Sequence, residues 1–250
     1  MNNKYLFETP LKEGIIIKRN SQFTMDVLID GNTVRCHCPA TTRIGDVELK
    51  NIACLLSYND DSKRKLKYTV EAVSFDEPSA PSKNWIGINL ILSNRIIEHL
   101  LTTHQLDEMV SNYSDIKREV ILGKSKLDFL VGDTYLEVKT PITTINVKYG
   151  PHIKTKKVSA FSSTDRFQKH ILELAGSLEA HNRAILLTVN QYVPTEMKPR
   201  LKSTHYEEVK NSLLTAINAG IETWNIDLLF EPDGVSLNSI TNTTKDILNY

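Results

Sequence analysis

The sequence predicts an α/β protein (α+β overall) in two parts, an N-terminal OB-like β-barrel over residues 1–80 and a mixed α/β domain over residues 83–250. Three observations predict this fold class. Short strand-like runs fill residues 14–75, a break with two prolines covers residues 77–82, and helical and strand-like segments alternate beyond it.

The barrel is predicted from short β-rich runs separated by turn residues such as Asp30-Gly31-Asn32. Five or six short strands over such a length favour a small closed barrel, for which the OB-like topology is the natural candidate. That architecture often presents a strand face and loops to single-stranded nucleic acid. The expected strands cover residues 14–18, 23–29, 33–38, 46–49, 54–58 and 66–75.

The second part begins with an amphipathic helix, because apolar residues recur at helical spacing over residues 89–101. The order helix, three strands, helix, strand, helix, strand then predicts a mixed sheet with helices on both faces. The later segments cover residues 119–122, a hairpin over 126–139, and residues 164–181, 184–189, 206–219 and 221–230.

The hairpin gathers two carboxylates and an ammonium on one face. Gly132-Asp133 suits a type II′ turn. Asp128 then lies opposite Glu137 with Cβ atoms roughly 4.5–5.5 Å apart, and period-two alternation puts Lys139 on the same face. The pairs nearer the turn are Val131 with Thr134, Leu130 with Tyr135 and Phe129 with Leu136.

Opposed carboxylates are unfavourable by ~0.2–1 kcal/mol, and a divalent cation reverses that sign. Mg²⁺ is usually held by one or two carboxylates together with water and phosphate oxygens. Lys139 could then polarise an attacking water or stabilise charge on a phosphate. The alternative is a solvated hairpin face whose charges only keep the protein soluble, since the spacing D-x(8)-E-x-K is moderately specific.

Thirty basic residues balance thirty acidic ones, so no net charge draws the protein onto nucleic acid. Binding must therefore use local patches, of which Lys63, Arg64 and Lys65 form one. No run approaches the ~20 apolar residues of a membrane span, and the first residues do not lead into a signal peptide. We expect a cytoplasmic protein that binds no membrane.

The three cysteines, Cys36, Cys38 and Cys54, lack a partner set at zinc-finger spacing. We expect inert buried thiols.

The helix beginning near Thr164 and Asp165 carries polar residues in its first turns: Arg166, Gln168, Lys169 and His170. Its N-terminus offers partial positive charge and unpaired N–H groups to a phosphate. The plainer interpretation takes Asp165 or Thr164 as an N-cap and His170 as a structural histidine.

Seven segments, in order along the chain, resemble the sugar fermentation stimulation protein A (SfsA) family. They are Phe23-Thr24-Met25-Asp26-Val27, His37-Cys38-Pro39, Ser62-Lys63-Arg64-Lys65, Asn84-Trp85-Ile86-Gly87-Ile88-Asn89, Lys126-Leu127-Asp128-Phe129, Leu136-Glu137-Val138-Lys139-Thr140 and Arg166-Phe167-Gln168-Lys169-His170.

The resemblance implies an OB-like domain joined to a nuclease domain of the PD-(D/E)XK type, in proteins described as DNA-binding, linked to sugar utilisation and active as DNA or RNA nucleases. By position, Asp128 and Glu137 match the metal-binding acids and Lys139 the motif lysine. Glu119 matches a further acidic position that would complete the site. Gln168, Lys169 and His170 match a Q-K-H on the following helix.

These observations lead to the hypothesis of a phosphodiesterase that uses Mg²⁺, or Mn²⁺, to cleave DNA or RNA. Asp128, Glu137 and Glu119 would hold metal, while Lys139 and Gln168 would join Asp128 and Glu137 in catalysis. Two copies, as a homodimer, would be needed to cut both strands of a duplex at once. The residues expected to bind nucleic acid are Lys63, Arg64, Lys65, Lys126, Arg166, Lys169 and His170.

The alternative is a DNA-binding regulator of sugar-utilisation genes that keeps a nuclease fold without turnover. It is motivated by a departure from the family pattern, since Ala40-Thr41-Thr42 follow Pro39 where the family has Asn-Thr-Gly. A small-molecule α/β enzyme is disfavoured, because no glycine-rich phosphate loop and no G-x-S-x-G elbow occur.

Overall fold

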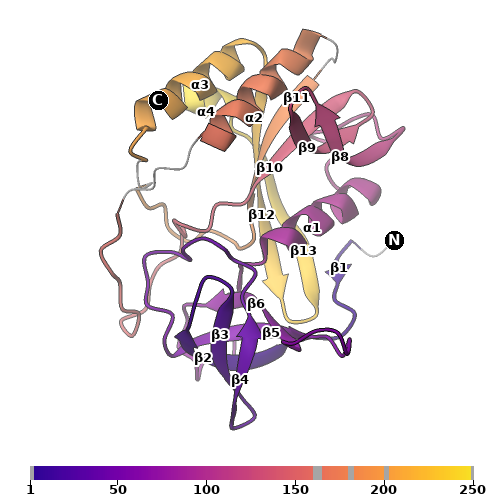
Figure 1. Cartoon of the computed structure of the whole chain (residues 1–250). Coiled ribbons are helices and arrows are strands. Elements are labelled where there is room, and N and C mark those ends of the chain that lie inside the picture. Colours follow the sequence, from indigo (N-terminus) through magenta and orange to yellow (C-terminus); the bar gives the residue numbers. More distant parts are fainter. Residues whose placement is uncertain (1–2, 160–164, 180–182, 200–202, 249–250) are drawn as a thin grey trace.

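The structure is a computed structural model that describes residues 3–159, 165–179, 183–199 and 203–248. Two parts are stacked along the long axis of the molecule (Figure 1). A small β-barrel lies at one end. A seven-stranded mixed sheet with its helices forms the other.

The barrel has five strands in the order β4-β3-β2-β5-β6, and a parallel contact between His37 and Thr69 closes it by joining β4 to β6. This order is the OB-type topology, so the predicted fold class is confirmed. A short strand, β7 (Ile86–Gly87), continues the barrel sheet beside β6 and past the predicted break. The five barrel strands are β2 (Lys12–Arg19), β3 (Thr24–Ile29), β4 (Asn32–His37), β5 (Ile52–Tyr58) and β6 (Tyr68–Ser74).

The prediction of a strand at residues 46–49 is wrong. Val47 forms only an isolated bridge, with Thr155, and the N–H of Glu48 donates to the carbonyl of Lys154 at 2.8 Å. The hydrogen bonds of this segment therefore go to a long loop of the second part. Sequence reasoning could not foresee a partner one hundred residues away.

The mixed sheet has the order β1-β13-β12-β11-β10-β9-β8, with parallel pairing of β10 to β11 and of β11 to β12. Parallel neighbours need a crossover, and α2 and α3 supply the two. Strands β1 and β13 were not predicted from the sequence. The sheet strands are β1 (Tyr5–Leu6), β8 (Ile116–Leu122), β9 (Ser125–Val131), β10 (Thr134–Lys139), β11 (Arg183–Asn190), β12 (Glu222–Glu231) and β13 (Gly234–Asn242).

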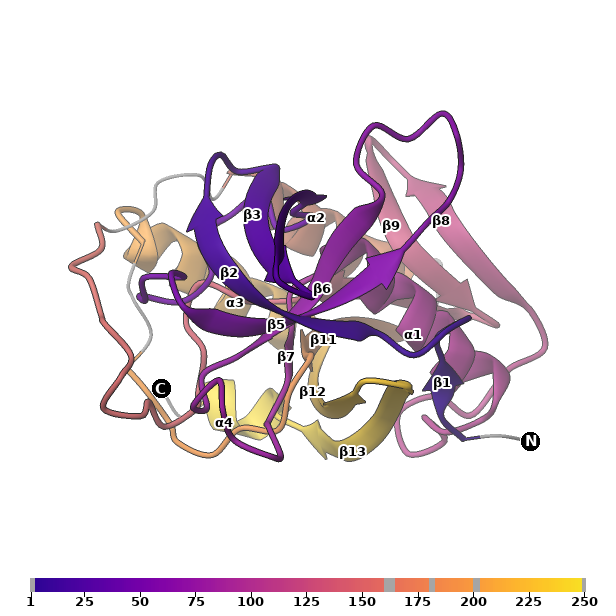
Figure 2. The same ribbon diagram turned by 90° about the horizontal axis from the view of Figure 1, so that it is seen from below.

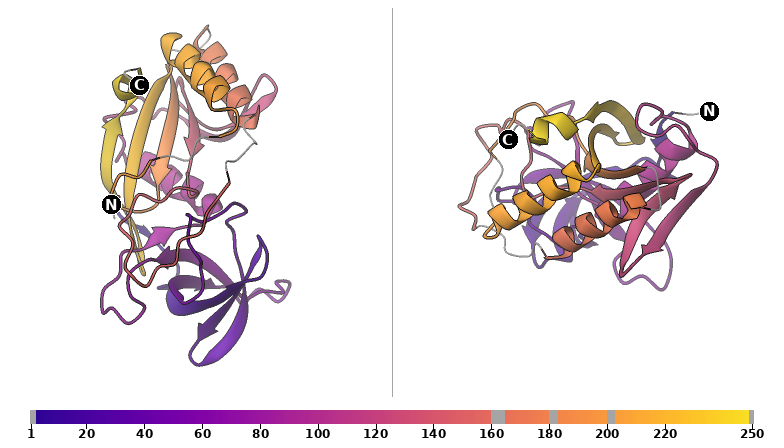
Figure 3. Two further views of the ribbon diagram at one scale, coloured as in Figure 1. Left: turned by 90° about the vertical axis from the view of Figure 1, so that its left-hand side faces the viewer. Right: turned by 90° about the horizontal axis from the view of Figure 1, so that it is seen from above.

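Helices cover both faces of this sheet, as predicted (Figure 3). α1 (Leu90–Thr102) packs its Ile96 and Leu100 against one face, while α2 (Asp165–Gly176) and α3 (Tyr206–Asn218) pack on the other. A 3₁₀ turn (Ser177–Glu179) follows α2, and α4 (Thr244–Leu248) is the last element. The two ends of the helix predicted over 164–181 lie outside the described residues. No helix in the described ranges is long and apolar enough to span a bilayer.

The barrel and the sheet share one hydrophobic core. Leu11, Leu55 and Ala72 of the barrel side belong to the same buried cluster as α1 and β12. The end of the β12–β13 hairpin lies next to the barrel (Figure 1 and Figure 2). There Phe230 bridges to Trp85. The two parts are therefore held together by buried apolar contacts as well as by the chain.

Candidate active site

The predicted hairpin forms with the predicted register: Thr134 pairs with Val131, Tyr135 with Leu130 and Leu136 with Phe129. Gly132 has φ of +57° while Asp133 does not have positive φ, as a type II′ turn requires. The backbone ladder ends before the two acids, because Oδ2 of Asp128 accepts the N–H of Val138 at 2.8 Å.

Glu137 lies under α2 and is only 2% exposed. Its Oε1 accepts hydrogen bonds from Nζ of Lys139 and from Nδ1 of His170, the latter at 2.6 Å. Its Oε2 is buried and has no hydrogen-bond partner among the residues described. The solvated-face interpretation is therefore wrong, since a carboxylate placed only for solubility would not be buried with one oxygen unsatisfied.

Asp128 is half-buried beside Glu137. Its Oδ1 accepts a hydrogen bond from Nδ2 of Asn94 on α1 at 2.8 Å. Burial, and then the charge of Glu137, raise the pKa of Asp128, against the opposing effects of its hydrogen bonds and of Lys139. Negative charge on Asp128 is therefore disfavoured, and a cation between the two carboxylates would relieve this.

These groups line a cleft of about 360 Å³. Carboxylate oxygens suit a hard divalent cation, and the unsatisfied Oε2 of Glu137 is the oxygen available to one. No cluster of three or more acidic, histidine or cysteine ligands occurs in the described ranges. Mg²⁺ needs no such cage, because it usually keeps several waters and takes phosphate oxygens. The cleft is lined by Lys126, Asp128, Glu137, Val138, Lys139, Phe167 and His170.

Glu119 is not brought into this cleft. Its φ is +55°, and its carboxylate accepts a hydrogen bond from Nζ of Lys126 at 2.7 Å with 65% of the side chain exposed. Lys126 itself lies on the rim. The metal-binding role expected for Glu119 stays a prediction without support from this geometry.

Of the four polar residues predicted on α2, His170 lines the cleft, whereas Gln168 and Lys169 do not. Nζ of Lys169 donates to the carbonyl of Lys124 in the β8–β9 turn at 3.0 Å. Gln168 precedes His170 by two residues, about 200° around the helix, and does not line the cleft. Its amide nitrogen is buried without a hydrogen-bond partner in the described structure. The side chain of Arg166 lies outside the described residues.

The basic patch Lys63, Arg64 and Lys65 lies on the barrel, in the loop between β5 and β6. Lys63 and Lys65 are exposed, while Nη2 of Arg64 donates to Oγ1 of Thr69 at 3.0 Å. None of the three lines the cleft beside Asp128 and Glu137. Any nucleic acid they bind must extend beyond the two carboxylates.

The cysteines are free and buried, as expected. Burial raises the pKa of the Cys36 thiol to about 11 and also raises the pKa of Cys38 and Cys54. They are poor metal ligands and poor nucleophiles at neutral pH.

Sequence reasoning missed Asn94 and the Ser93–Thr140 pair. Asn94 stands on the polar side of an amphipathic helix, where nothing distinguishes it from a solvated residue. Oγ of Ser93 lies 2.8 Å from Oγ1 of Thr140, directly after Lys139. Both contacts join α1 to the hairpin across more than thirty residues, so only the folded chain reveals them.

Comparison with known proteins matches both parts of the chain. Residues 17–88 match the family model described as the SfsA N-terminal OB domain, and residues 91–234 match the sugar fermentation stimulation protein RE domain. Sugar fermentation stimulation protein homologs from Synechocystis sp. and Nostoc punctiforme are 32% and 33% identical over 238 and 241 residues, each alignment covering 90% of this chain and 92% of the relative. The structure of Pyrococcus furiosus SfsA in complex with Ca²⁺ has the same fold, with a TM-score of 0.70 and 20% identity over 95% of this chain and 97% of that one.

Proposed function

This chain belongs to the sugar fermentation stimulation protein family, and we propose that it is a Mg²⁺-dependent phosphodiesterase of the PD-(D/E)XK type that cleaves nucleic acid. One observation carries the proposal: buried Glu137, with an unsatisfied oxygen, stands beside half-buried Asp128 in a cleft that also contains Lys139. The Ca²⁺ of the Pyrococcus furiosus structure supports a divalent cation in a protein of this fold. Mn²⁺ would serve as well, because it prefers similar oxygen ligands.

Asp128 and Glu137 would hold the cation, and the residues around them fix their orientation. The hydrogen bonds from Asn94 and Val138 orient Asp128. His170 orients Glu137 and, because a carboxylate can only accept, carries its proton on Nδ1. The bound cation would polarise the scissile phosphate and lower the pKa of a water at the site.

Lys139 would serve the water or the phosphate directly. Its ammonium has three donors, of which Glu137 takes one, and its side chain is 35% exposed toward solvent. A cation there stabilises the charge that develops on phosphate oxygens during in-line attack. Lys126, which also lines the cleft, would contact a neighbouring phosphate.

The barrel supports a nucleic-acid substrate, because OB-type domains commonly bind oligonucleotides. A second candidate function is binding of nucleic acid without cleavage. It is favoured because Oε1 of Glu137 already accepts hydrogen bonds from both Lys139 and His170. In that case the pair would be a charge-neutralised relic, and binding would depend on the barrel cations alone.

The variant Glu137→Gln distinguishes the phosphodiesterase from the protein that binds without cleavage. We expect Mg²⁺-dependent cleavage of labelled DNA or RNA to fall by at least about 100-fold, since losing even a residue that only supports a metal ligand costs 10–100-fold. Glu108→Gln, an exposed carboxylate in the loop after α1, is the matched control. Equal cleavage by Glu137→Gln and wild type would refute the site. Tight binding by wild type without cleavage in Mg²⁺ or Mn²⁺ would favour the regulator.

A further inference from the structure

Helix α1 contacts the barrel and the metal cleft with two asparagines. Nδ2 of Asn89, the N-cap residue, donates to Oε2 of Glu71 on β6 at 2.7 Å, while Asn94 donates to Asp128. Five residues separate them, or about 7.5 Å of helix. A stacked strand rises about 3.4 Å per nucleotide, so this length corresponds to about two nucleotides.

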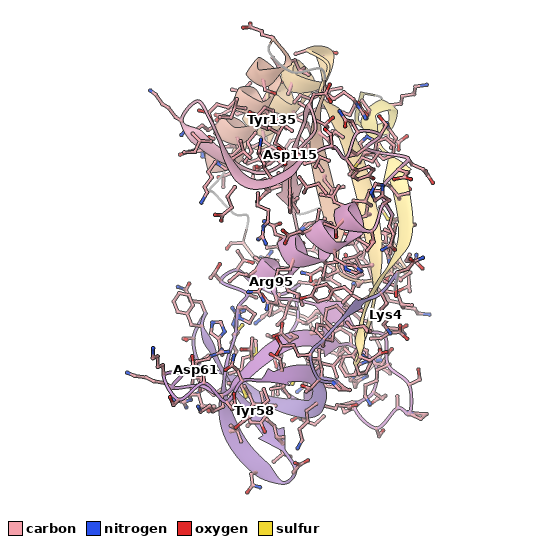
Figure 4. All side chains as sticks on the ribbon, turned by 90° about the vertical axis from the view of Figure 1, so that its right-hand side faces the viewer. Lys4, Tyr58, Asp61, Arg95, Asp115 and Tyr135 are labelled. Atoms are coloured by element: carbon pink, nitrogen blue, oxygen red, sulfur yellow. The ribbon has the colours of Figure 1, made fainter. Side chains whose placement is uncertain are left out.

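Arg95 follows Asn94 on this helix and is exposed. Figure 4 shows Arg95 below α1 and above the part of the barrel that carries Tyr58 and Asp61. Asp61 begins the stretch of the β5–β6 loop that contains Arg64. Arg95 therefore lies between the metal cleft and the basic loop of the barrel.

Arg64 and helix α1, which carries Arg95, both come to the neighbourhood of Glu71. Nη2 of Arg64 donates to Oγ1 of Thr69, two residues before Glu71 on β6, and Asn89 at the start of α1 donates to Glu71 itself. Burial raises the pKa of Glu71, and the charges of both arginines act in the opposite direction. Its two oxygens are already used, since Oε1 accepts from Oγ of Ser57 at 2.5 Å and Oε2 from Asn89. Glu71 therefore does not neutralise the arginines through an ion pair.

In the described ranges neither arginine forms an ion pair, and Arg64 makes one side-chain hydrogen bond, to Thr69. Two positive charges in the same region repel one another, and an anion between the two arginines would relieve this repulsion. Their planar forks match phosphate oxygens in bidentate geometry.

An exposed aromatic side chain lies where the β5–β6 loop that carries Arg64 begins. Tyr58, at the end of β5 and 55% exposed, packs on Tyr68 with ring centroids 5.1 Å apart. An exposed ring next to cations is the arrangement that stacks unpaired bases. A duplex keeps its bases inside, so this surface favours a single strand.

We propose that Arg64 and Arg95 form a second phosphate-binding position that carries a single-stranded nucleic acid from the barrel surface at Tyr58 to the metal cleft. The proposal rests on the proposed function. It adds a substrate class, a single strand long enough to span both positions, and assigns a role to Arg95. A small phosphodiester that fills only the cleft would not contact this second phosphate-binding position.

Salt dependence of binding tests the position without cleavage. A fluorescent single-stranded DNA is titrated in EDTA at several salt concentrations, with fluorescence anisotropy as the readout. Each of Arg64→Ala and Arg95→Ala should reduce the slope of log K against log salt by about 0.7. Tyr58→Ala should weaken binding about tenfold and leave the slope unchanged, because stacking releases no counterions.

Lys50→Ala is the charge-matched control, at the far end of β5 from the basic loop and exposed. It should leave slope and affinity unchanged, and every variant should keep the wild-type melting temperature. Wild-type slopes for both arginine variants would overturn the proposal. So would a slope change seen with duplex DNA but not with the single strand.

Cleavage separates this proposal from the proposed function. With a long single strand, Arg95→Ala should lower kcat/KM about tenfold, while hydrolysis of bis(p-nitrophenyl) phosphate should be unchanged. Glu137→Gln should lose both activities. Equal losses on both substrates for Arg95→Ala would overturn the second position. If wild type cleaves neither substrate, the proposed function fails while the anisotropy slopes still decide this inference.

Discussion

At the scale of single residues, the two acids of the hairpin do different things for the folded chain. Glu137 is buried and fixed by Lys139 and His170, whereas Asp128 is half-buried with its pKa raised by burial and by Glu137. The apo protein thus holds charge in an unfavourable place. Such a position is typical of a site that serves a ligand instead of stability.

Asp128→Asn should therefore stabilise the apo protein. The amide removes the charge that burial and Glu137 disfavour, so in EDTA the melting temperature should rise, and Mg²⁺ or Mn²⁺ should no longer raise it further. Thermal denaturation with and without metal is the measurement, with Glu108→Gln as control. A lower melting temperature for Asp128→Asn in EDTA would contradict the account.

The pH dependence of stability has a defined sign at this residue. The pKa of Asp128 is raised in the folded state above its ordinary value of 3.8. At a pH between 3.8 and the pKa of the folded state, the folded protein therefore binds more protons than the unfolded chain. The free energy of unfolding contributed by Asp128 therefore falls as the pH rises through that window. Urea denaturation in EDTA over this pH range should show a shallower fall for Asp128→Asn than for wild type.

The proximity of Asp128, Glu137 and Lys139 could be predicted from the sequence, because strand periodicity and the hairpin turn together bring them to one face. The residues that orient them could not. Asn94 and His170 come from helices 34 and 33 residues away along the chain from the acids they contact. Gln168 and Lys169 lie next to His170 in the sequence, but they lie on other faces of α2 and do not line the cleft.

At the scale of elements, the hairpin depends on its turn. Gly132 has φ of +57°, and a Cβ there would lie 2.7 Å from Cγ and 2.8 Å from the backbone oxygen of Asn112. Gly31 in the β3–β4 turn also has positive φ, +79°, but a Cβ would meet nothing within 4 Å. Substitution of Gly31 therefore tests backbone strain alone, whereas substitution of Gly132 tests strain together with a steric clash.

Gly132→Ala should destabilise the protein more than Gly31→Ala. Gly31→Ala should cost about 1–2 kcal/mol, the penalty of an L-residue in the left-handed region. Gly132→Ala should cost about 1–3 kcal/mol more, because the backbone of Asn112 must move. Urea denaturation of both variants measures the difference. Equal costs would mean that the turn tolerates the clash.

At the scale of the whole molecule, the barrel and the sheet should unfold as one unit, because they share a buried core. Phe230 is 2% exposed, bridges to Trp85 and packs on Phe7 with ring centroids 5.6 Å apart. Phe230→Ala should cost about 3–5 kcal/mol. The neighbouring Leu229, 42% exposed, provides the control Leu229→Ala with a much smaller cost.

Two probes follow this unfolding. Trp85 lies at the junction and Trp224 in the sheet, so tryptophan fluorescence reports mainly on the sheet side, while far-UV circular dichroism also reports on the barrel. Both transitions should coincide in wild type and move together in Phe230→Ala. A barrel transition that stays at the wild-type midpoint would contradict the single unit.

The sequence predicted the barrel, helices α1 to α3 and the central strands, because these have strong local periodicity. It did not predict β13, whose Ser236, Asn238 and Ser239 dilute the apolar pattern, nor the two-residue β1 and the short α4. The error at residues 46–49 has another cause, since its partner is a loop without periodicity. Contacts between the two parts depend on tertiary packing and leave no local signal.

The central claim is that Asp128 and Glu137 hold a divalent cation, and a crystal soaked in Mn²⁺ tests it most directly. The account predicts an anomalous peak in contact with Oε2 of Glu137 and with the carboxylate of Asp128, at about 2.0–2.2 Å from the oxygens and absent in Glu137→Gln crystals. An empty cleft in wild type, with the Mn²⁺ peaks elsewhere and Lys139 still on Glu137, would contradict it.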